Sequence, residues 1–110
     1  MGENIVELTT ENFDSTINKG KWVIDFWTSW CAPCKIMAPH FDAAAKDFTG
    51  KVHFGKVNLD ENYELAERFQ IMSVPTTLFM NNRKILYGSV GAINKEQIIK
   101  FVHEYFNTGK

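Results

Sequence analysis

Residues 21–35 read KWVIDFWTSWCAPCK and join an apolar segment to a pair of cysteines. Lys21–Thr28 is apolar on both faces apart from Asp25, which is typical of a central strand covered on both sides. A helical pattern follows from about Ala32 to Phe48. Because chemistry in α/β sheets tends to lie at the carboxyl ends of parallel strands, the pattern predicts a reactive site between this strand and its helix.

Strand-like and helix-like segments alternate along the rest of the chain, without a repeat, a low-complexity tract or a linker. Strands are expected at 4–8, 21–28, 51–60, 76–80 and 83–88, and helices at 10–18, 32–48, 62–70 and 94–106. This order favours an α/β fold with three layers, in which helices cover both faces of one sheet.

Capping and turn residues mark where some of these elements begin or end. Thr10 is expected to cap the first helix, and Asn94 with Gln97 has the pattern of a capping box. Asn81 and Asn82 separate two β-rich segments and suit the positive φ angles of a tight hairpin turn. The last two strands are therefore expected to be antiparallel, which makes the sheet mixed.

The two long helices each have an apolar stripe. Pro39 lies inside the first of them and cannot donate to the helix ladder, so a kink is expected there. The stripe of that helix consists of Met37, Phe41, Ala44, Ala45 and Phe48. In the last helix, the residues expected to face the sheet are Ile98, Val102, Tyr105 and Phe106.

Length and composition predict an ordinary globular protein, with residues 1–110 forming a single domain. The chain is 45% hydrophobic and 23% charged, and 12 basic against 13 acidic residues leave a formal charge of −1. Such a balance offers no basic field for nucleic acid or an anionic membrane. No apolar run is long enough to span a bilayer, and the first residues do not resemble an export signal, so a cytoplasmic location is expected.

Cys31 and Cys34 form a C-x-x-C pair, and the chain has no other cysteine. A disulfide that closes so short a loop stabilises little, so the pair is expected to react rather than to hold the fold. Cys31 would stand at the start of a helix, where unpaired N–H groups favour a thiolate, and Pro33 suits the first turn. Cys34 is expected to be more buried and to attack a mixed disulfide formed at Cys31.

The alternative for the two thiols is half of a metal site. Zinc needs four ligands, and the only histidines are His40, His53 and His103. His53 and His103 do not have the usual ligand spacing, and His40 follows Pro39. We therefore expect neither a metal nor a cofactor apart from the redox-active Cys31–Cys34 disulfide itself.

Three blocks of residues resemble the thioredoxin family: WCAPCK preceded by DFW, VPT at Val74–Thr76, and VGAINKEQI at Val90–Ile98. The similarity runs from about Ile5 to Phe106. It implies the thioredoxin fold, a central mixed sheet of about five strands between about four helices. It also implies an enzyme, a general protein-disulfide reductase that works by dithiol–disulfide exchange, with Cys31 attacking and Cys34 resolving.

Asp25 is an acid in a segment that is expected to be buried. On the alternation of its strand it shares a face with Val23 and Trp27, and burial should raise its pKa toward neutrality. The resemblance implies that it accepts the proton of Cys34, through water, with Lys56 of the neighbouring strand as its charge partner. Otherwise it is a structural acid satisfied by a lysine or by backbone groups.

The resemblance also implies a substrate surface around the dithiol. Residue type alone predicts a trans peptide before Pro75, since about 5–6% of such bonds are cis, but the resemblance implies a cis Val74–Pro75 bond. That bond would pair with an extended substrate and keep metal from the thiols. The remaining substrate-binding residues would be Trp30, Ala32, Pro33, Val74, Gly91 and Ala92.

Two of these residues have an alternative interpretation. A side chain at position 91 would keep a substrate backbone at a distance, yet Gly91 could equally be an ordinary loop glycine. Trp30 could be exposed by chance, and Phe26 and Trp27 are expected in the core. Ser73 and Ser89 are expected to flank the groove.

The expected partners are a separate thioredoxin reductase and disulfide-containing client proteins, with the chain itself a monomer. Ala32 replaces the glycine common in the family, which leaves the reduction potential open. An oxidant or isomerase would use the same fold, but the absence of an export signal disfavours it. A third alternative is a binding subunit in which turnover is incidental.

Overall fold

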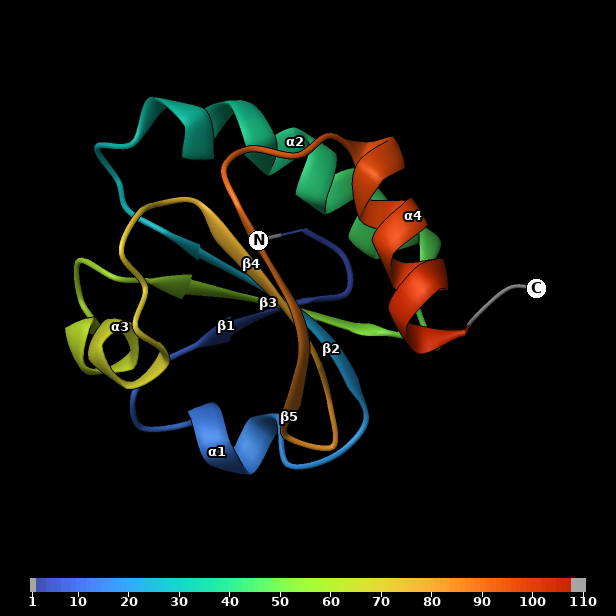
Figure 1. Cartoon of the computed structure of the whole chain (residues 1–110), viewed down its shortest axis with the longest axis horizontal. Helices are drawn as coiled ribbons and strands as arrows, with labels where there is room; N and C mark the ends of the chain where they lie inside the picture. Colours follow the sequence, from blue (N-terminus) through green and yellow to red (C-terminus); the bar gives the residue numbers. More distant parts are fainter. Residues whose placement is uncertain (1, 108–110) are drawn as a thin grey trace.

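The computed structural model describes residues 2–107, which form one sheet with helices on both of its faces (Figure 1). Its strands are β1 (Ile5–Leu8), β2 (Lys21–Trp27), β3 (His53–Asn58), β4 (Thr76–Asn81) and β5 (Lys84–Val90). Its helices are α1 (Phe13–Thr16), α2 (Ala32–Asp47), α3 (Tyr63–Phe69) and α4 (Lys95–Phe106). The expected α/β architecture, with five strands and four helices in the described part of the chain, is confirmed.

The sheet is mixed and has the strand order β1-β3-β2-β4-β5. β1 and β2 both run parallel to β3, whereas β4 is antiparallel to both β2 and β5. β2 is therefore the central strand, which explains its apolar character on both faces. In the register of the sheet, Asp25 lies beside Lys56 of β3 and Thr77 of β4.

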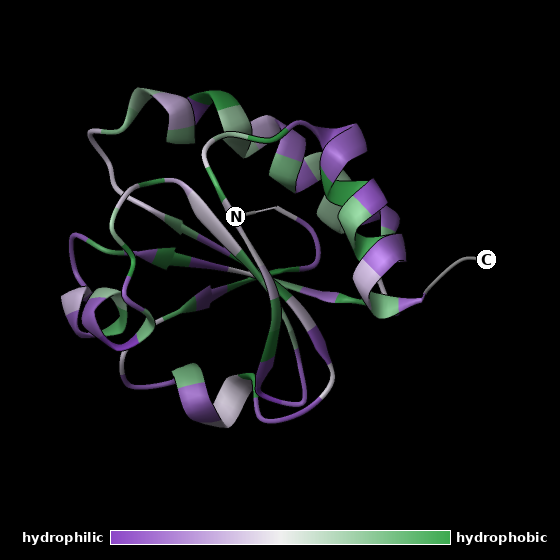
Figure 2. Cartoon of the chain, in the orientation of Figure 1, coloured by the Kyte–Doolittle hydropathy of each residue, from purple (hydrophilic) through white to green (hydrophobic). Residues whose placement is uncertain are grey.

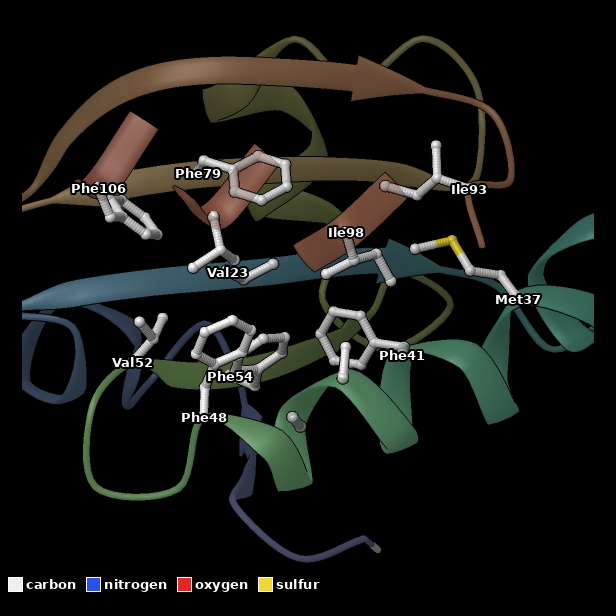
Figure 3. Packing of buried hydrophobic residues seen from close by; sticks show 13 residues of the cluster. Val23, Met37, Phe41, Phe48, Val52, Phe54, Phe79, Ile93, Ile98 and Phe106 are labelled. Carbon is white, nitrogen blue, oxygen red and sulfur yellow. The ribbon is translucent and has the colours of Figure 1, made fainter. Parts of the chain in front are cut away.

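Two hydrophobic clusters, one on each face of the sheet, hold the helices against it. Hydropathy alternates along α2 and α4 (Figure 2), and the buried residues of both helices belong to one cluster with residues of the sheet. Figure 3 shows Phe41 of α2 and Ile98 of α4 packed against Val23 and Phe79 of the sheet. The opposite face of the sheet packs against α1 and α3, where Phe13 is fully buried. Each large side chain buried in this way contributes roughly 1.5–3 kcal/mol.

The first helix begins later than expected, and Thr10 does not cap it. α1 starts at Phe13, after a turn in which Thr9 N donates to Asn12 Oδ1 (2.7 Å) and Asn12 N donates to Thr9 Oγ1 (3.1 Å). Thr10 N instead donates to Asn62 Oδ1 at 2.9 Å. The side chains of this turn thus satisfy the backbone before the helix can begin.

The hairpin between β4 and β5 is antiparallel as expected, but its turn lies one residue later. Asn81 pairs with Lys84, and the two residues with positive φ are Asn82 (51°) and Arg83 (72°). Asn82 Oδ1 accepts a hydrogen bond from Gly20 N (2.9 Å), a contact between residues far apart in the sequence. That tertiary contact fixes which asparagine occupies the turn.

The two long helices follow the sequence pattern closely. All five residues of the first stripe are buried: four lie in α2, and the fifth, Phe48, is its C-cap. Asn94 and Gln97 form a complete capping box on α4. Tyr105 is only half-buried, because its ring stacks on Tyr87 at 4.6 Å between centroids rather than entering the core. Pro39 lies inside α2, and the kink there remains a prediction. Among residues 2–107, none of the helices could cross a bilayer.

Candidate active site

The cysteine pair lies where β2 gives way to α2. Cys31 is the N-cap of α2, Pro33 lies in the first turn, and a disulfide joins Cys31 to Cys34 across a Cα–Cα distance of 5.3 Å. Cys34 N donates to Cys31 Sγ at 3.1 Å. This donor and the positive end of the helix dipole both stabilise negative charge on the Cys31 sulfur.

The expectation that Cys34 is the more buried cysteine is wrong. Each residue is 4% exposed. Cys31 is covered because its Sγ lies 3.7 Å from the carbonyl oxygen of Val74, in the loop that leads into β4. The Val74–Pro75 peptide is cis, which confirms the expectation taken from the family resemblance.

Gly91 lies next to the same loop, since its N–H donates to the Pro75 carbonyl at 2.8 Å. Its φ angle is +100°, a conformation that side-chain-bearing residues rarely adopt. A Cβ atom at this position would meet nothing within 4 Å. Backbone conformation within the protein therefore explains this glycine, and its role toward a substrate remains a prediction.

Asp25 is 2% exposed and lines a small cavity together with Cys34. The cavity has a volume of about 160 Å³ and is lined by Asp25, Trp27, Cys34, Lys35, Ala38 and Lys56. Burial raises the pKa of Asp25 to about 7, against the opposing charge of Lys56 and with a further increase from Asp42. Its Oδ1 has no hydrogen-bond partner in the described part of the chain. The carboxyl group can thus exchange protons near neutrality on the Cys34 side of the pair.

Lys56 influences Asp25, but its ion pair is with a different acid. Lys56 Nζ lies 3.5 Å from Oδ1 of Asp42, on α2. Sequence reasoning missed Asp42, although a signal was present: Cys34, Ala38 and Asp42 follow each other at four-residue spacing and so share one face of the helix.

The expected substrate surface falls into two separate hollows. Trp30 and Val74 belong to an apolar groove of about 440 Å³, which is lined by Thr28, Trp30, Leu59, Ile71, Met72, Ser73 and Val74. Ala92 lines a second hollow of about 230 Å³, together with His40 and residues of α2 and α4. Ala32 and Pro33 are exposed at the start of α2.

The groove contains residues that sequence reasoning did not single out. Met72 is 92% exposed and Trp30 is 74% exposed, which is unusual for such large apolar side chains. Asp60 holds the loop before Trp30, accepting from Ser29 N at 2.9 Å and from Ser29 Oγ at 2.7 Å. These hydrogen bonds lower the pKa of Asp60. Ile71, Met72 and Val74, three apolar residues close before Pro75, were the available signal for Met72.

Of the other expected residue positions, some are confirmed and some are wrong. Phe26 is buried in the core, but Trp27 is half-buried and faces the Asp25 cavity. Ser89 is 8% exposed within the β4–β5 ladder, so it does not flank the groove, whereas Ser73 does. Within residues 2–107, no cluster of three or more His, Cys, Asp or Glu side chains could hold a metal ion.

Comparison with known proteins gives a consistent match over nearly the whole chain. The family model described as Thioredoxin matches residues 4–104. A thioredoxin of Buchnera aphidicola subsp. Acyrthosiphon pisum is 40% identical over 105 residues, which cover 94% of this chain and 97% of that protein. A thioredoxin of Staphylococcus saprophyticus is 36% identical over 92% of this chain and 97% of its own. One of Pseudomonas aeruginosa is 34% identical over 93% and 96%.

Proposed function

Because this chain belongs to the thioredoxin family, we propose that it works as a general protein-disulfide reductase. It is a thiol–disulfide oxidoreductase, with Cys31 and Cys34 as its redox-active pair. The observation that carries the proposal is the position of Cys31 at the N-cap of α2, bonded to a Cys34 that lines the cavity of a buried acid.

In the proposed reaction, the reduced protein transfers two electrons to a client disulfide. The Cys31 thiolate attacks one client sulfur, the client S–S bond breaks, and the leaving client thiolate takes a proton. Cys34 then loses its proton and attacks Cys31 Sγ, which breaks the mixed disulfide and releases the second client thiol. The protein is left with the Cys31–Cys34 disulfide that the structure contains.

Asp25 is proposed as the proton acceptor of Cys34 in the second step. Both residues line the same cavity, whose size allows a bridging water. A carboxyl group with a pKa of about 7 is ionised often enough to take a proton and protonated often enough to return one. Lys56 contributes positive charge beside it.

Client binding is proposed on the surface around the dithiol. Pro75 and its neighbours present backbone beside Cys31, and an extended client segment could pair there as a strand. Trp30 and Val74 would contact its apolar side chains in the groove. The remaining contacts are proposed for Ala32, Pro33, Gly91 and Ala92.

The same proposal includes the surroundings in which the protein works. A separate thioredoxin reductase would return two electrons to the Cys31–Cys34 disulfide after each cycle. Clients would be disulfide-containing proteins of the cytoplasm, and the chain would act as a monomer with residues 1–110 as one domain. No bound cofactor is needed for the exchange itself, since both electrons come from the dithiol.

Trapping of the mixed disulfide tests the cysteine roles. We expect the reduced Cys34→Ser variant, incubated with insulin, to accumulate an adduct through Cys31, because nothing remains to resolve it. The adduct is measured by non-reducing mass spectrometry. Cys31→Ser is the matched control and should form no comparable adduct. A Cys34→Ser variant that stays unmodified while the wild type reduces insulin would refute the assignment.

The direction of transfer is tested by equilibration with graded dithiothreitol redox buffers. Wild-type protein that becomes fully reduced only at a low potential, with both thiols titrating together, supports a reductase. A high potential would instead indicate an oxidant or isomerase.

A further inference from the structure

Asp42 lies close to the proposed proton acceptor but belongs to a different element. It projects from α2 on the face that also carries Cys34, two turns earlier, and its Oδ1 lies 3.5 Å from Lys56 Nζ. Lys56 is the register neighbour of Asp25 on the adjacent parallel strand. One lysine therefore stands between two carboxyl groups.

Hydrogen bonding in this group is incomplete. Oδ1 of Asp25 and Oδ1 of Asp42 are both buried atoms without a hydrogen-bond partner among the described residues. The Lys56 side chain is 19% exposed and that of Asp42 is 44% exposed, so the pair connects the cavity to the surface. An ammonium group that leans toward one of the two carboxyl groups stabilises the other less, since electrostatic attraction weakens with distance.

We propose that Asp42 is a positioning residue, which competes with Asp25 for the ammonium group of Lys56 and so controls how readily the acceptor of the Cys34 proton takes and gives up that proton. This inference rests on the proposed role of Asp25. It adds a residue that neither the C-x-x-C pattern nor the pairing of Asp25 with Lys56 contains.

Electrostatics gives the direction of the effect. An ammonium group drawn fully to Asp25 would stabilise its carboxylate and make it a weaker base. While Asp42 holds Lys56, that stabilisation is reduced, and the negative charge of Asp42 acts in the same sense. In agreement, the charge of Lys56 lowers the pKa of Asp25 and that of Asp42 raises it.

The groups that face Asp25 come from two elements besides its own. β3 contributes Lys56, and α2 contributes Cys34, Lys35 and, through Lys56, Asp42. The β4 residue in register with Asp25 is Thr77, which carries no charge. Asp42 is therefore the negatively charged group whose removal should change the electrostatic environment of Asp25.

The test measures the protonation of Asp25 itself, apart from activity. In the oxidised protein with ¹³C-labelled carboxyl groups, the Asp25 signal is assigned by its loss in Asp25→Asn and titrated by NMR. We expect Asp42→Asn to move the Asp25 midpoint to lower pH, and Asp42→Glu, which keeps the charge, to remain close to wild type. An unchanged or higher midpoint in Asp42→Asn would overturn the inference.

Asp47 offers a matched control on the same helix. Its Oδ2 pairs with Lys95 Nζ at 3.2 Å, and its side chain is 48% exposed, close to the exposure of Asp42. Asp47→Asn removes the same charge in an equivalent ion pair elsewhere, so the Asp25 midpoint should not change. A shift as large as that of Asp42→Asn would show a general charge effect and overturn a specific role.

A double-mutant cycle with Lys56→Met separates competition from simple repulsion. Without the lysine there is nothing to compete for, so Asp42→Asn should shift the Asp25 midpoint much less than in the wild-type background. Shifts of equal size in both backgrounds would overturn the competition.

Kinetics keeps this inference distinct from the proposed function. If the Asp25 midpoint moves as expected, the low-pH limb of the rate of Cys34 attack on the mixed disulfide should move with it. Should the NMR midpoint move while the rate profile does not, the role of Asp25 in catalysis fails and the coupling to Asp42 stands. Should Asp25→Asn alter the rate profile while Asp42→Asn leaves the Asp25 midpoint unchanged, the coupling to Asp42 fails and the role of Asp25 in catalysis stands.

Discussion

Asp25 has a protonation state that matters both for chemistry and for the cost of burying it. At the residue scale, its carboxyl group is 2% exposed, and Oδ1 lacks a hydrogen bond. An ionised carboxylate at such a site loses hydration that a lysine shared with Asp42 compensates only in part. The neutral form is therefore favoured to unusually high pH, which is the property that a proton acceptor working near neutrality requires.

Asp25→Asn should slow the attack of Cys34 on the mixed disulfide, because an amide cannot accept the proton. We expect a loss of up to about 100-fold at neutral pH, with little change in the affinity for client. Single-turnover release of client from Cys31 measures this step. The rate of the first attack by Cys31 serves as the internal control, and a pH–rate profile identical to that of wild type would remove Asp25 from the mechanism.

Sequence patterns located the individual residues better than their partners. The alternation along β2 was sufficient to predict that Asp25 is buried on the same face as Val23. The helical pattern that follows was sufficient to predict that Cys31 lies at the start of α2. Helical spacing placed Asp42 on the face of Cys34, but its ion pair with Lys56 was not foreseeable, because it depends on how α2 packs across β3, which no local pattern encodes. Met72 was missed for a related reason, since exposure of an apolar side chain is decided by the loops around it.

At the scale of elements, α4 illustrates how local signals define a helix. Asn94 Oδ1 accepts from Gln97 N at 2.8 Å, and Gln97 Oε1 accepts from Asn94 N at 2.9 Å. Both residues are exposed, so their contribution comes from satisfied N–H groups rather than from packing. The sequence pattern could therefore predict this boundary unaided.

Asn94→Ala should lower the free energy of unfolding by about 1 kcal/mol, because the backbone N–H of Gln97 loses its side-chain acceptor. Urea unfolding of the oxidised protein measures the change. Lys100→Ala, at an exposed site within the same helix, is the control and should have a much smaller effect. Equal losses in the two variants would mean that the capping box is not what stabilises the helix start.

Elements whose ends depend on distant residues were predicted less well. The turn after β4 is fixed by the hydrogen bond from Gly20 N to Asn82, and Arg83 in the same turn forms an ion pair with Asp14 at 3.2 Å. Thr10 likewise binds Asn62 across the fold instead of capping α1. Propensity and spacing describe a segment in isolation, whereas these boundaries are decided by contacts made only after folding.

At the scale of the whole molecule, the buried acid links stability to pH. The two hydrophobic clusters hold Asp25 in place, so the fold bears the cost of ionising it. The pKa of Asp25 is about 7 in the folded protein, against an ordinary aspartate pKa of 3.8 that applies to the unfolded chain. Between these values the folded state retains a proton that the unfolded state has released.

The free energy of unfolding should therefore fall as the pH rises from near 4 to near 7, with the loss complete above the folded pKa. Its size is on the order of a few kcal/mol. Asp14 acts in a different window, since hydrogen bonding from Arg68 lowers its pKa and its contribution disappears only in more acidic solution. Asp25→Asn cannot ionise and should show a flatter curve than wild type across this interval.

Urea unfolding of oxidised wild-type and Asp25→Asn protein, at several pH values across this interval, measures both curves. The variant should be the more stable protein above pH 7, where wild type buries a charge, and the difference should shrink toward pH 4. The residue that serves the chemistry would then be one that weakens the fold under working conditions, a relation expected of functional sites. Parallel curves for the two proteins would mean that Asp25 ionises at the same pH folded and unfolded, and its part in the proton transfer would lose its physical basis.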